Sequence, residues 1–459
     1  MVHAFENNGF FIAVDANSGS IFSIDEVTYE ILKAFPENLS GQEVMEKLGG
    51  MFDADVISEA CDEIESLKEQ QMLYSPDPDD STLLKQLENN NGLKALCLHI
   101  AHGCNLACEY CFASKGDYCT GNKLMSEDVA LRAVDFLARH SGNRENIEID
   151  FFGGEPLINY EVVKRAVAYG KEIEKNTGKK FHFTLTTNGT LLDKDIIDFI
   201  NQYMDNVVVS LDGRQEVHDR MRFYRDGSGS YEDIAARARE LVKGRKNKDY
   251  FIRGTFTGEN LDFSEDVFHI AGLGFNEVSI EPVVGSGEPF HITQEHIPAI
   301  LDEYDRLAKR YLEYIKSGNR LRFYHFNLNL FKGPCIQRRI IACGAGFEYL
   351  AVSPEGHLYP CHQFVGQRQF IIGDVYEGIN DINGITEEFK GCNVITKEEC
   401  KKCWAKYYCS GGCHANAYFS NGSIFIPNEL ACIMQRKRIE CAIMIELAAS
   451  EDNFGDGWR

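Results

Sequence analysis

Residues 104–111 read CNLACEYC, and this stretch decides how the rest of the chain is interpreted. Its three cysteines, Cys104, Cys108 and Cys111, follow an apolar run at 95–100 that has the pattern of a buried strand. Three thiolates at this spacing can surround one four-iron cluster and leave one iron without a protein ligand. A structural zinc site normally has four protein ligands, and an electron-transfer cluster normally has four cysteines. The missing ligand therefore predicts an iron that binds a small molecule, in a site built for chemistry.

The composition limits the class of protein and its partners. The chain has 459 residues, more than one hydrophobic core usually organises, so we expect two or three domains. Its 47 basic and 70 acidic residues give a formal net charge of −23, which argues against nucleic acid as a partner. Neither an apolar stretch of about 18 residues nor a signal peptide is evident, so we expect no membrane partner and a cytoplasmic location. In that reducing compartment, the 16 cysteines fit metal ligation better than a disulfide scaffold.

The order of the sequence patterns predicts an N-terminal unit, a linker and two further domains. Residues 1–75 read as a small α+β unit. Residues 76–94 begin with a stretch rich in proline and aspartate and read as a linker. Residues 95–320 alternate between strand and helix, whereas residues 321–459 have little regular periodicity, many cysteines and one closing helix. In the N-terminal unit, we expect strands at 10–14 and 19–24 and helices at 26–34, 40–48 and 54–71.

The alternation in the middle of the chain predicts an α/β fold. Six strand–helix repeats imply a parallel sheet that is closed or partly closed into a barrel. Eight repeats would make a full barrel, so a partial (β/α)6 barrel has an open side for a large substrate, and its site lies at the carboxyl ends of the strands. The expected strands lie at 95–100, 147–152, 182–187, 206–211, 250–256 and 277–282, and the expected helices at 126–140, 160–175, 192–203, 231–243, 264–272 and 295–317.

Glycine-rich and polar motifs stand at the ends of these strands. Gly153 and Gly154 end the second strand and let the backbone approach a ligand closely, while Glu155 offers a carboxylate for an ammonium group. Taken alone, the later Thr-Asn-Gly and Leu-Asp-Gly motifs are common structural turns, but their order on successive strand ends favours one binding site. The other candidates are Tyr110 for stacking on an adenine-like ring, Asn188 and Ser210 on the third and fourth strand ends, and Arg253 with Arg220 or Arg222 for a ligand carboxylate.

The CX3CX2C motif, with an aromatic residue before its last cysteine and Gly-Gly-Glu-Pro one strand later, resembles the radical S-adenosylmethionine superfamily. The resemblance implies that the open iron chelates the amino and carboxylate groups of S-adenosylmethionine. One electron from the reduced cluster then yields a 5′-deoxyadenosyl radical, which removes a hydrogen atom from the substrate. It would place Gly154 and Glu155 at the methionine amino group, and Asn188 and Ser210 near the ribose and methionyl moieties.

The cysteines of the C-terminal region form an ordered array that resembles the SPASM extension of peptide-modifying radical enzymes. That extension holds two auxiliary clusters, so the resemblance implies three [4Fe–4S] clusters in all. The alternative is a pair of zinc knuckles without a catalytic role. If Cys335 is not the fourth ligand of the inner cluster, that cluster keeps an open iron for a substrate thiolate. The implied ligands are Cys400, Cys403, Cys409 and Cys432 for the outer cluster, and Cys343, Cys361 and Cys413 for the inner one.

The N-terminal unit resembles winged-helix-like domains that bind the leader of a precursor peptide by adding it as a strand to a sheet edge. A generic accessory or dimerisation domain is the alternative. Taken whole, the chain resembles maturases of six-cysteine (SCIFF-type) peptides, which form thioether crosslinks between a cysteine sulfur and a carbon of the same peptide. This resemblance implies two partners, a cysteine-rich precursor peptide and a low-potential electron donor such as a ferredoxin or flavodoxin. The rival activity is formylglycine formation of the anaerobic sulfatase-maturase type, or another radical modification of a peptide.

Overall fold

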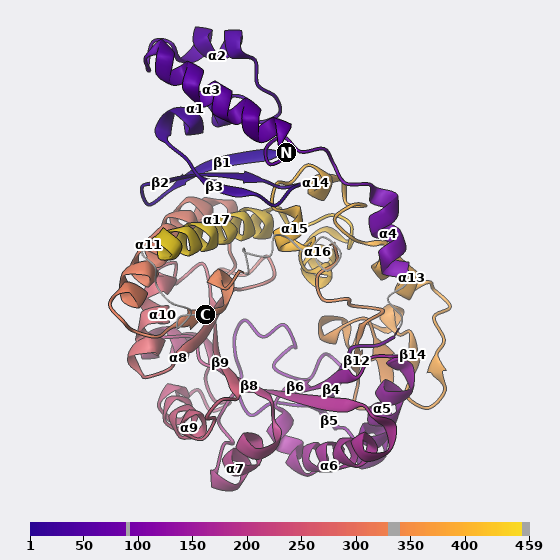
Figure 1. The fold of residues 1–459 in the computed structure, drawn as a ribbon. Helices are drawn as coiled ribbons and strands as arrows, with labels where there is room; N and C mark the ends of the chain where they lie inside the picture. Colours follow the sequence, from indigo (N-terminus) through magenta and orange to yellow (C-terminus); the bar gives the residue numbers. More distant parts are fainter. Residues whose placement is uncertain (89–91, 329–339, 452–459) are drawn as a thin grey trace.

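The computed structural model describes residues 1–88, 92–328 and 340–451, and Figure 1 shows their arrangement. The N-terminal unit is a three-stranded antiparallel sheet with the order β1-β2-β3, covered on one face by helices. Because side chains alternate along β2, Ala13 packs against these helices while Ile12 and Val14 face the rest of the molecule. The elements are β1 (Val2–Asn7), β2 (Phe10–Asp15), β3 (Ile21–Ser23), α1 (Glu26–Ala34), α2 (Gly41–Leu48) and α3 (Ala54–Glu69).

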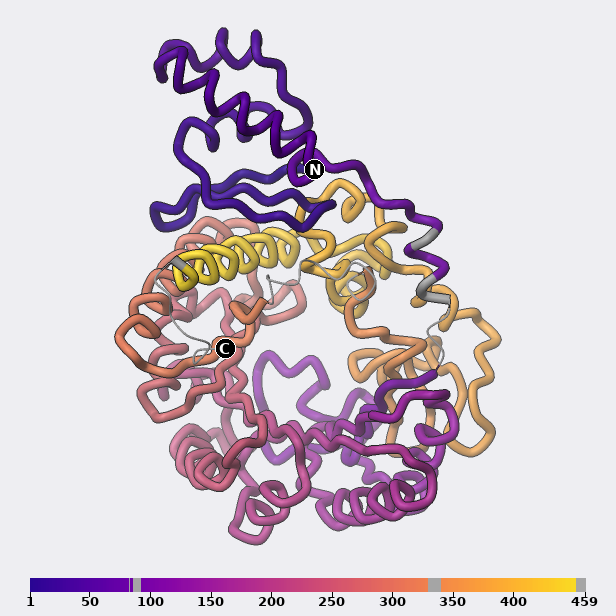
Figure 2. The backbone as a smooth tube through the Cα atoms, in the orientation of Figure 1, coloured from indigo at the N-terminus to yellow at the C-terminus, as the bar shows by residue number. Residues whose placement is uncertain are grey.

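The second face of this small sheet lies over the long C-terminal helix α17 (Glu429–Glu451), as Figure 2 shows. The Asn7 amide donates to Asp305 Oδ1 at 2.6 Å, and the His3 ring stacks on Trp404 with 4.1 Å between centroids. Strand β1, which the sequence patterns did not predict, provides these contacts. The N-terminal unit is thus docked onto the body of the protein.

The segment expected as a linker contains a helix, α4 (Asp80–Glu88). Its Leu83 is buried in a small cluster with Ile340, Ile341 and Val394. Through this contact the segment packs against the C-terminal region.

The middle of the chain forms the expected parallel sheet. All eight positions of β4 are buried, as expected for a strand covered on both faces. Along β6, Ile147, Ile149 and Phe151 are fully buried and alternate with less buried residues, and Figure 1 shows the helices outside the curved sheet. The parallel strands are, in spatial order, β4 (Ala95–His102), β6 (Asn146–Gly153), β7 (Lys180–Thr187), β8 (Asn206–Ser210), β9 (Asp249–Phe256), β10 (Glu277–Pro282) and β11 (Arg322–Phe323). The helices are α5 (Glu127–His140), α6 (Tyr160–Thr177), α7 (Lys194–Tyr203), α8 (Gln215–Met221), α9 (Tyr231–Lys243), α10 (Phe263–Gly272) and α11 (Ile297–Lys316).

The C-terminal region continues this sheet. Strand β12 (Tyr349–Val352) pairs in parallel with β4, on the side opposite β6, and it leads into an antiparallel series. The sequence patterns did not predict these short strands, whereas the closing helix at 429–448 corresponds to α17. No helix in the described part of the chain is long and apolar enough to cross a membrane. The remaining elements are β5 (Lys123–Leu124), β13 (His357–Tyr359), β14 (Gly373–Asp374), β15 (Gly378–Ile379), α13 (Ile385–Gly391), α14 (Glu398–Lys401), α15 (Lys406–Cys409) and α16 (His414–Asn421).

Candidate active site

Cys104, Cys108 and Cys111 line one cavity at the carboxyl ends of the parallel strands. The loop that carries them directly follows β4, so the first strand places all three thiols at this edge of the sheet. The sequence-predicted residues that line the same cavity are Tyr110, Gly153, Gly154, Asn188, Ser210, Arg222 and Arg253.

The three thiols lie close enough to influence one another electrostatically. Burial raises the pKa of Cys108 to about 12, a value that includes an opposing effect of the Arg222 guanidinium and smaller raising effects of Cys104 and Cys111. Burial and the Glu155 carboxylate raise the pKa of Cys104 to about 11. As free thiols, these two groups would be protonated at neutral pH. Positively charged iron would favour their thiolate forms, so this loop fits a metal cluster better than a set of free thiols.

Gly154 is the point where the cysteine loop touches the end of β6. A Cβ atom added at Gly154 would lie 2.2 Å from the Gly103 carbonyl oxygen and 2.8 Å from the Gly116 carbonyl oxygen. Two backbone hydrogen bonds close this crossing, from Gly154 N to Ala101 O at 2.8 Å and from Glu155 N to Gly103 O at 2.9 Å. Only a residue without a side chain fits here, so the glycine predicted to approach a ligand also sets the position of the cysteine loop.

Glu155 is fully buried beside the cavity and is held by donors of the protein itself. Its Oε1 accepts hydrogen bonds from the Thr187 hydroxyl at 2.8 Å and from Leu157 N at 3.0 Å, and its Oε2 accepts one from Asn188 N at 2.7 Å. Burial raises its pKa to about 7. In the structure this carboxylate ties the end of β6 to the end of β7.

Asn188 contacts one of the three cysteines of the loop. Its amide nitrogen lies 3.4 Å from Cys104 Sγ and 2.9 Å from Asn105 Oδ1, and its Oδ1 accepts from the Thr190 hydroxyl at 2.6 Å. The side chain that was expected near a ribose is therefore occupied by contacts that position the thiol.

A buried polar cluster lies behind Cys108. Asp212 accepts hydrogen bonds from the Tyr110 hydroxyl at 2.5 Å, from Arg222 Nε at 3.1 Å and from Thr255 N at 3.0 Å. Burial raises the pKa of Tyr110 well above its usual value, so its hydroxyl remains a donor. Tyr110 and Arg222 thus share a carboxylate, and the guanidinium stacks 5.2 Å from the Tyr110 ring centroid.

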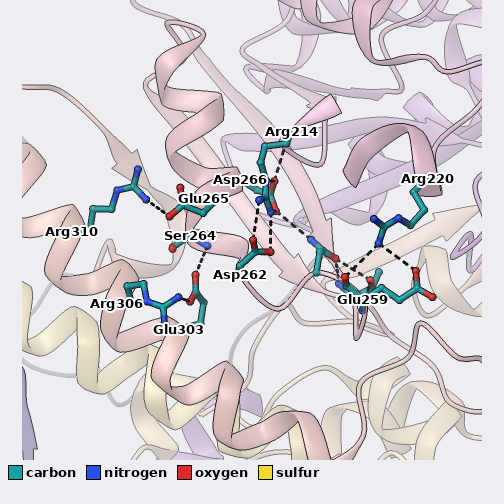
Figure 3. Close-up of polar contacts among 12 residues, drawn as sticks. Arg214, Arg220, Glu259, Asp262, Ser264, Glu265, Asp266, Glu303, Arg306 and Arg310 are labelled. Carbon is teal, nitrogen blue, oxygen red and sulfur yellow. Dashed lines mark hydrogen bonds and ion pairs between the residues drawn. The ribbon is translucent and has the colours of Figure 1, made fainter. Parts of the chain in front are cut away.

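The loop that carries Asp212 is braced from the outside by a second charge network (Figure 3). Arg214 donates from Nε to Asp266 at 2.9 Å and from Nη1 and Nη2 to Asp262 at 2.9 and 2.8 Å. Asp266 is fully buried in α10, so the arginine compensates its charge. Arg220, one of the alternatives for a ligand carboxylate, instead pairs with Glu259 at 3.6 Å (Figure 3). The brace fixes the end of β8 against α10.

The C-terminal cysteines fall into two groups by their mutual electrostatic influence. After burial, the largest influences that raise the pKa of Cys361 include Cys413 and Cys343. Burial likewise raises the pKa of Cys400 to about 12, with further contributions from Cys409, Cys432 and Cys403. These groups have the same members as the implied ligand sets, although the sets themselves stay predictions. Cys335 lies outside the described residues.

A second cavity continues from the first toward these cysteines. Arg253, Glu281 and Gln363 line both cavities, and the second one is also lined by Cys413 and Cys409, with Cys432 nearby on its wall. The cysteine loop after β4 and the C-terminal cysteines therefore border two neighbouring cavities that share a wall.

Sequence reasoning missed several residues of these cavities. Glu281 lies at the end of β10 and lines the first cavity, so the strand-end rule that selected Ser210 could have found it. His362 follows Cys361 immediately and lines the first cavity, which adjacency to a cysteine of the array could have indicated.

Comparisons with known proteins agree with this geometry. The model of the radical SAM superfamily matches residues 98–262, and that of SPASM, an iron–sulfur cluster-binding domain, matches residues 343–404. The radical SAM cyclopropyl synthase TigE of Paramaledivibacter caminithermalis is 21% identical over 454 residues, covering 90% of this chain and 88% of TigE. The structure of anSMEcpe with bound AdoMet has a TM-score of 0.65 at 21% identity, covering 79% of this chain and 100% of that one. Streptococcus suis SuiB bound to S-adenosylmethionine has a TM-score of 0.55 at 15% identity, covering 94% and 98%.

The sheet, the three-cysteine loop and the cysteine array define an iron–sulfur enzyme with an auxiliary cluster-binding domain. Residues 98–262 therefore form a radical SAM domain, and a SPASM domain follows it at residues 343–404.

Proposed function

We propose that this enzyme installs intramolecular thioether crosslinks in a ribosomally made, cysteine-rich precursor peptide. The observation that carries the proposal is the pair of neighbouring cavities, one lined by Cys104, Cys108 and Cys111 and the other by Cys413. A peptide bound across both cavities would have one segment beside the site of hydrogen abstraction. Another segment would lie beside a cysteine group that can hold a sulfur. Crosslinking needs both at once.

The residues around the first cavity fit the cofactors of the superfamily. Cys104, Cys108 and Cys111 would hold a four-iron cluster, and Gly153, Gly154 and Ser210 line the same cavity, where S-adenosylmethionine would bind. When bound, this pair supplies a carbon-centred radical that abstracts hydrogen. We infer three such clusters, with the array divided as predicted and with the role of Cys335 open.

The protein's own residues position the reacting groups. Asn188 and the Asp212 cluster fix Cys104 and Arg222 at the first site, while Arg253 and Glu281 border the passage to the second. Each crosslink removes one hydrogen atom from the acceptor carbon and one proton from the thiol, and leaves one electron for an acceptor. The product is thus two hydrogens lighter than the peptide, and the cysteine group around Cys413 is the nearest site for the sulfur and the electron.

A peptide substrate also agrees with the N-terminal unit and with a relative. The outer edge of β3 has no strand partner among the described residues, so it can accept an added strand. SuiB has been solved bound to precursor peptide SuiA, and that structure has a TM-score of 0.51 to this chain. We interpret the unit as a winged-helix-like leader-binding domain, the parallel sheet as a partial (β/α)6 barrel, and the electron donor as a ferredoxin or flavodoxin.

The test is mass spectrometry of a cysteine-rich precursor peptide after anaerobic incubation with the reconstituted enzyme, S-adenosylmethionine and reductant. We expect a loss of two hydrogens per crosslink, with one cysteine per crosslink protected from alkylation. An aldehyde product would instead support formylglycine formation. Absence of 5′-deoxyadenosine from fully reconstituted enzyme would refute the radical chemistry itself.

Matched variants test the division of labour between the two cysteine groups. Cys413→Ala should still form 5′-deoxyadenosine but no crosslink, since its change lies at the second site. Cys119→Ser is the control, because Cys119 is exposed and belongs to neither group. If Cys413→Ala crosslinks the peptide as fast as the control, the second site has no part in forming the bond.

A further inference from the structure

A buried lysine lies within the C-terminal cysteine array. Lys397 is 1% exposed and precedes α14, three residues before Cys400. Its Nζ donates to the Gly411 carbonyl oxygen at 2.8 Å, in the loop that joins Cys409 to Cys413. Its own carbonyl oxygen accepts from Cys400 N at 3.1 Å. The lysine therefore connects two cysteine-bearing segments through their backbone.

This ammonium has no carboxylate in an ion pair with it among the residues that the structure describes. Other buried or partly buried lysines do have one, since Lys406 lies 3.7 Å from Asp77 and Lys437 lies 2.6 Å from Asp305. A buried charge without a compensating charge costs several kcal/mol. The Lys397 ammonium therefore needs a negatively charged partner other than a carboxylate.

The nearest candidates for that anion are thiolates. Burial raises the pKa values of Cys400 and Cys432 to about 12 and about 11, and the positive charge of Lys397 lowers both. The same charge also acts on Cys392, which is fully buried and lies outside the ligand pattern. The charge of Lys397 thus acts on Cys392 and on two members of the outer cysteine group, Cys400 and Cys432.

We propose that Lys397 is the fixed counter-ion of the iron–sulfur cluster bound by Cys400, Cys403, Cys409 and Cys432. This inference rests on the proposed cluster at that group, but not on the identity of the peptide product. A thiolate-bound cluster carries net negative charge, which increases when it accepts an electron. A positive charge buried beside it stabilises the reduced form most, so Lys397 raises the reduction potential of the outer cluster. It therefore helps this cluster to accept an electron released during catalysis.

The experiment is an EPR-monitored redox titration of the reconstituted holoenzyme, together with its iron content. Lys397→Gln keeps a donor for the Gly411 carbonyl but removes the charge, and Lys397→Arg keeps both. Lys401→Gln is the matched control, because Lys401 is exposed on the same helix and pairs with Glu398. We expect Lys397→Gln to move the midpoint potential of one cluster to a more negative value, while Lys397→Arg and the control stay near the wild type.

The proposal is overturned if Lys397→Gln keeps its full iron content and all its midpoint potentials match the wild type. If Lys397→Gln loses iron, the Lys397→Arg variant distinguishes the explanations. Retention of iron by Lys397→Arg supports a requirement for positive charge at this position, and loss of iron from both variants refutes that requirement. A shifted potential in an enzyme that makes no crosslink would contradict the proposed function and leave the counter-ion role supported.

Discussion

Replacing Gly154 with alanine tests whether the crossing between β6 and the cysteine loop sets the geometry of the first cluster. The new Cβ would lie 2.2 Å from Gly103 O and 2.8 Å from Gly116 O, and both neighbours are backbone atoms that cannot rotate away. Overpacking of this kind costs about 1–3 kcal/mol, and each of the two backbone hydrogen bonds at the crossing contributes about 1 kcal/mol. We therefore expect a total cost of roughly 3–5 kcal/mol, borne by the loop that carries Cys104.

The assay is formation of 5′-deoxyadenosine by the reconstituted variant, with iron content measured in parallel. If about 2 kcal/mol of the cost falls on the competent loop geometry, the rate should drop roughly 30-fold. Gly272→Ala is the control, since Gly272 ends α10 with open space where its Cβ would lie. A Gly154→Ala variant with wild-type iron and a wild-type rate would refute the argument that this contact positions the cluster loop.

Three further predictions concern charges near the site. Asp212→Asn should destabilise the protein by about 3–5 kcal/mol in chemical unfolding, because it leaves the Arg222 charge buried without its partner. The control Asp226→Asn, in an exposed turn, should have no measurable effect. Arg214→Met should lower the free energy of unfolding by roughly 3–5 kcal/mol, because it leaves the buried Asp266 without its partner. Arg310→Met removes a surface pair with Glu265 and should lower it by less than about 1 kcal/mol. Equal effects would contradict a stabilising role for the Arg214 network. Burial raises the pKa of Asp150 from 3.8 to about 7, so the folded state binds a proton at this carboxyl more tightly than the unfolded state does. The stabilising contribution of the protonated side chain is therefore lost as the pH rises from about 4 to 7. Asp150→Asn should flatten that part of the plot of unfolding midpoint against pH and make the variant more stable than the wild type above pH 7; superimposable curves would show that Asp150 does not titrate in this way.

The parallel sheet and the first cavity could be predicted from the sequence because both follow local rules. Each of the six strands is a run of apolar residues followed by a polar or glycine motif, and the carboxyl ends of parallel strands meet at one edge. For this reason Gly153, Asn188 and Ser210, which are far apart in the sequence, line the same cavity as Cys104.

The elements that were missed depend on distant partners. Strand β1 contains Asn7, whose buried amide interrupts the apolar pattern and is satisfied by Asp305, 298 residues away. Strands β12 to β15 span two to four residues each, too short for a periodic signal, and they form because β4 offers an edge. Helix α4 follows a proline-rich stretch that predicts a break in structure, and Leu83 finds its partners only in the C-terminal region.

The roles within the site were also less predictable than its location. A carboxylate after a strand can face a ligand or a neighbouring strand, and the sequence does not distinguish the two cases. Glu155 faces the end of β7, and the Tyr110 hydroxyl faces Asp212, because each buried polar group must be paired.

The pairing of β12 with β4 has a consequence for electron transfer. Cys104 follows β4, and Cys361 follows the hairpin that β12 begins, so one hydrogen-bonded ladder spans the two cysteine groups. Tunnelling rates depend steeply on distance, and a pair of sites on a flexible joint would exchange electrons at a rate that varies with every domain motion. Here the paired strands hold the two cysteine groups at a constant distance from each other. If the two groups bind the proposed clusters, the distance that an electron must cross between them does not change with domain motion.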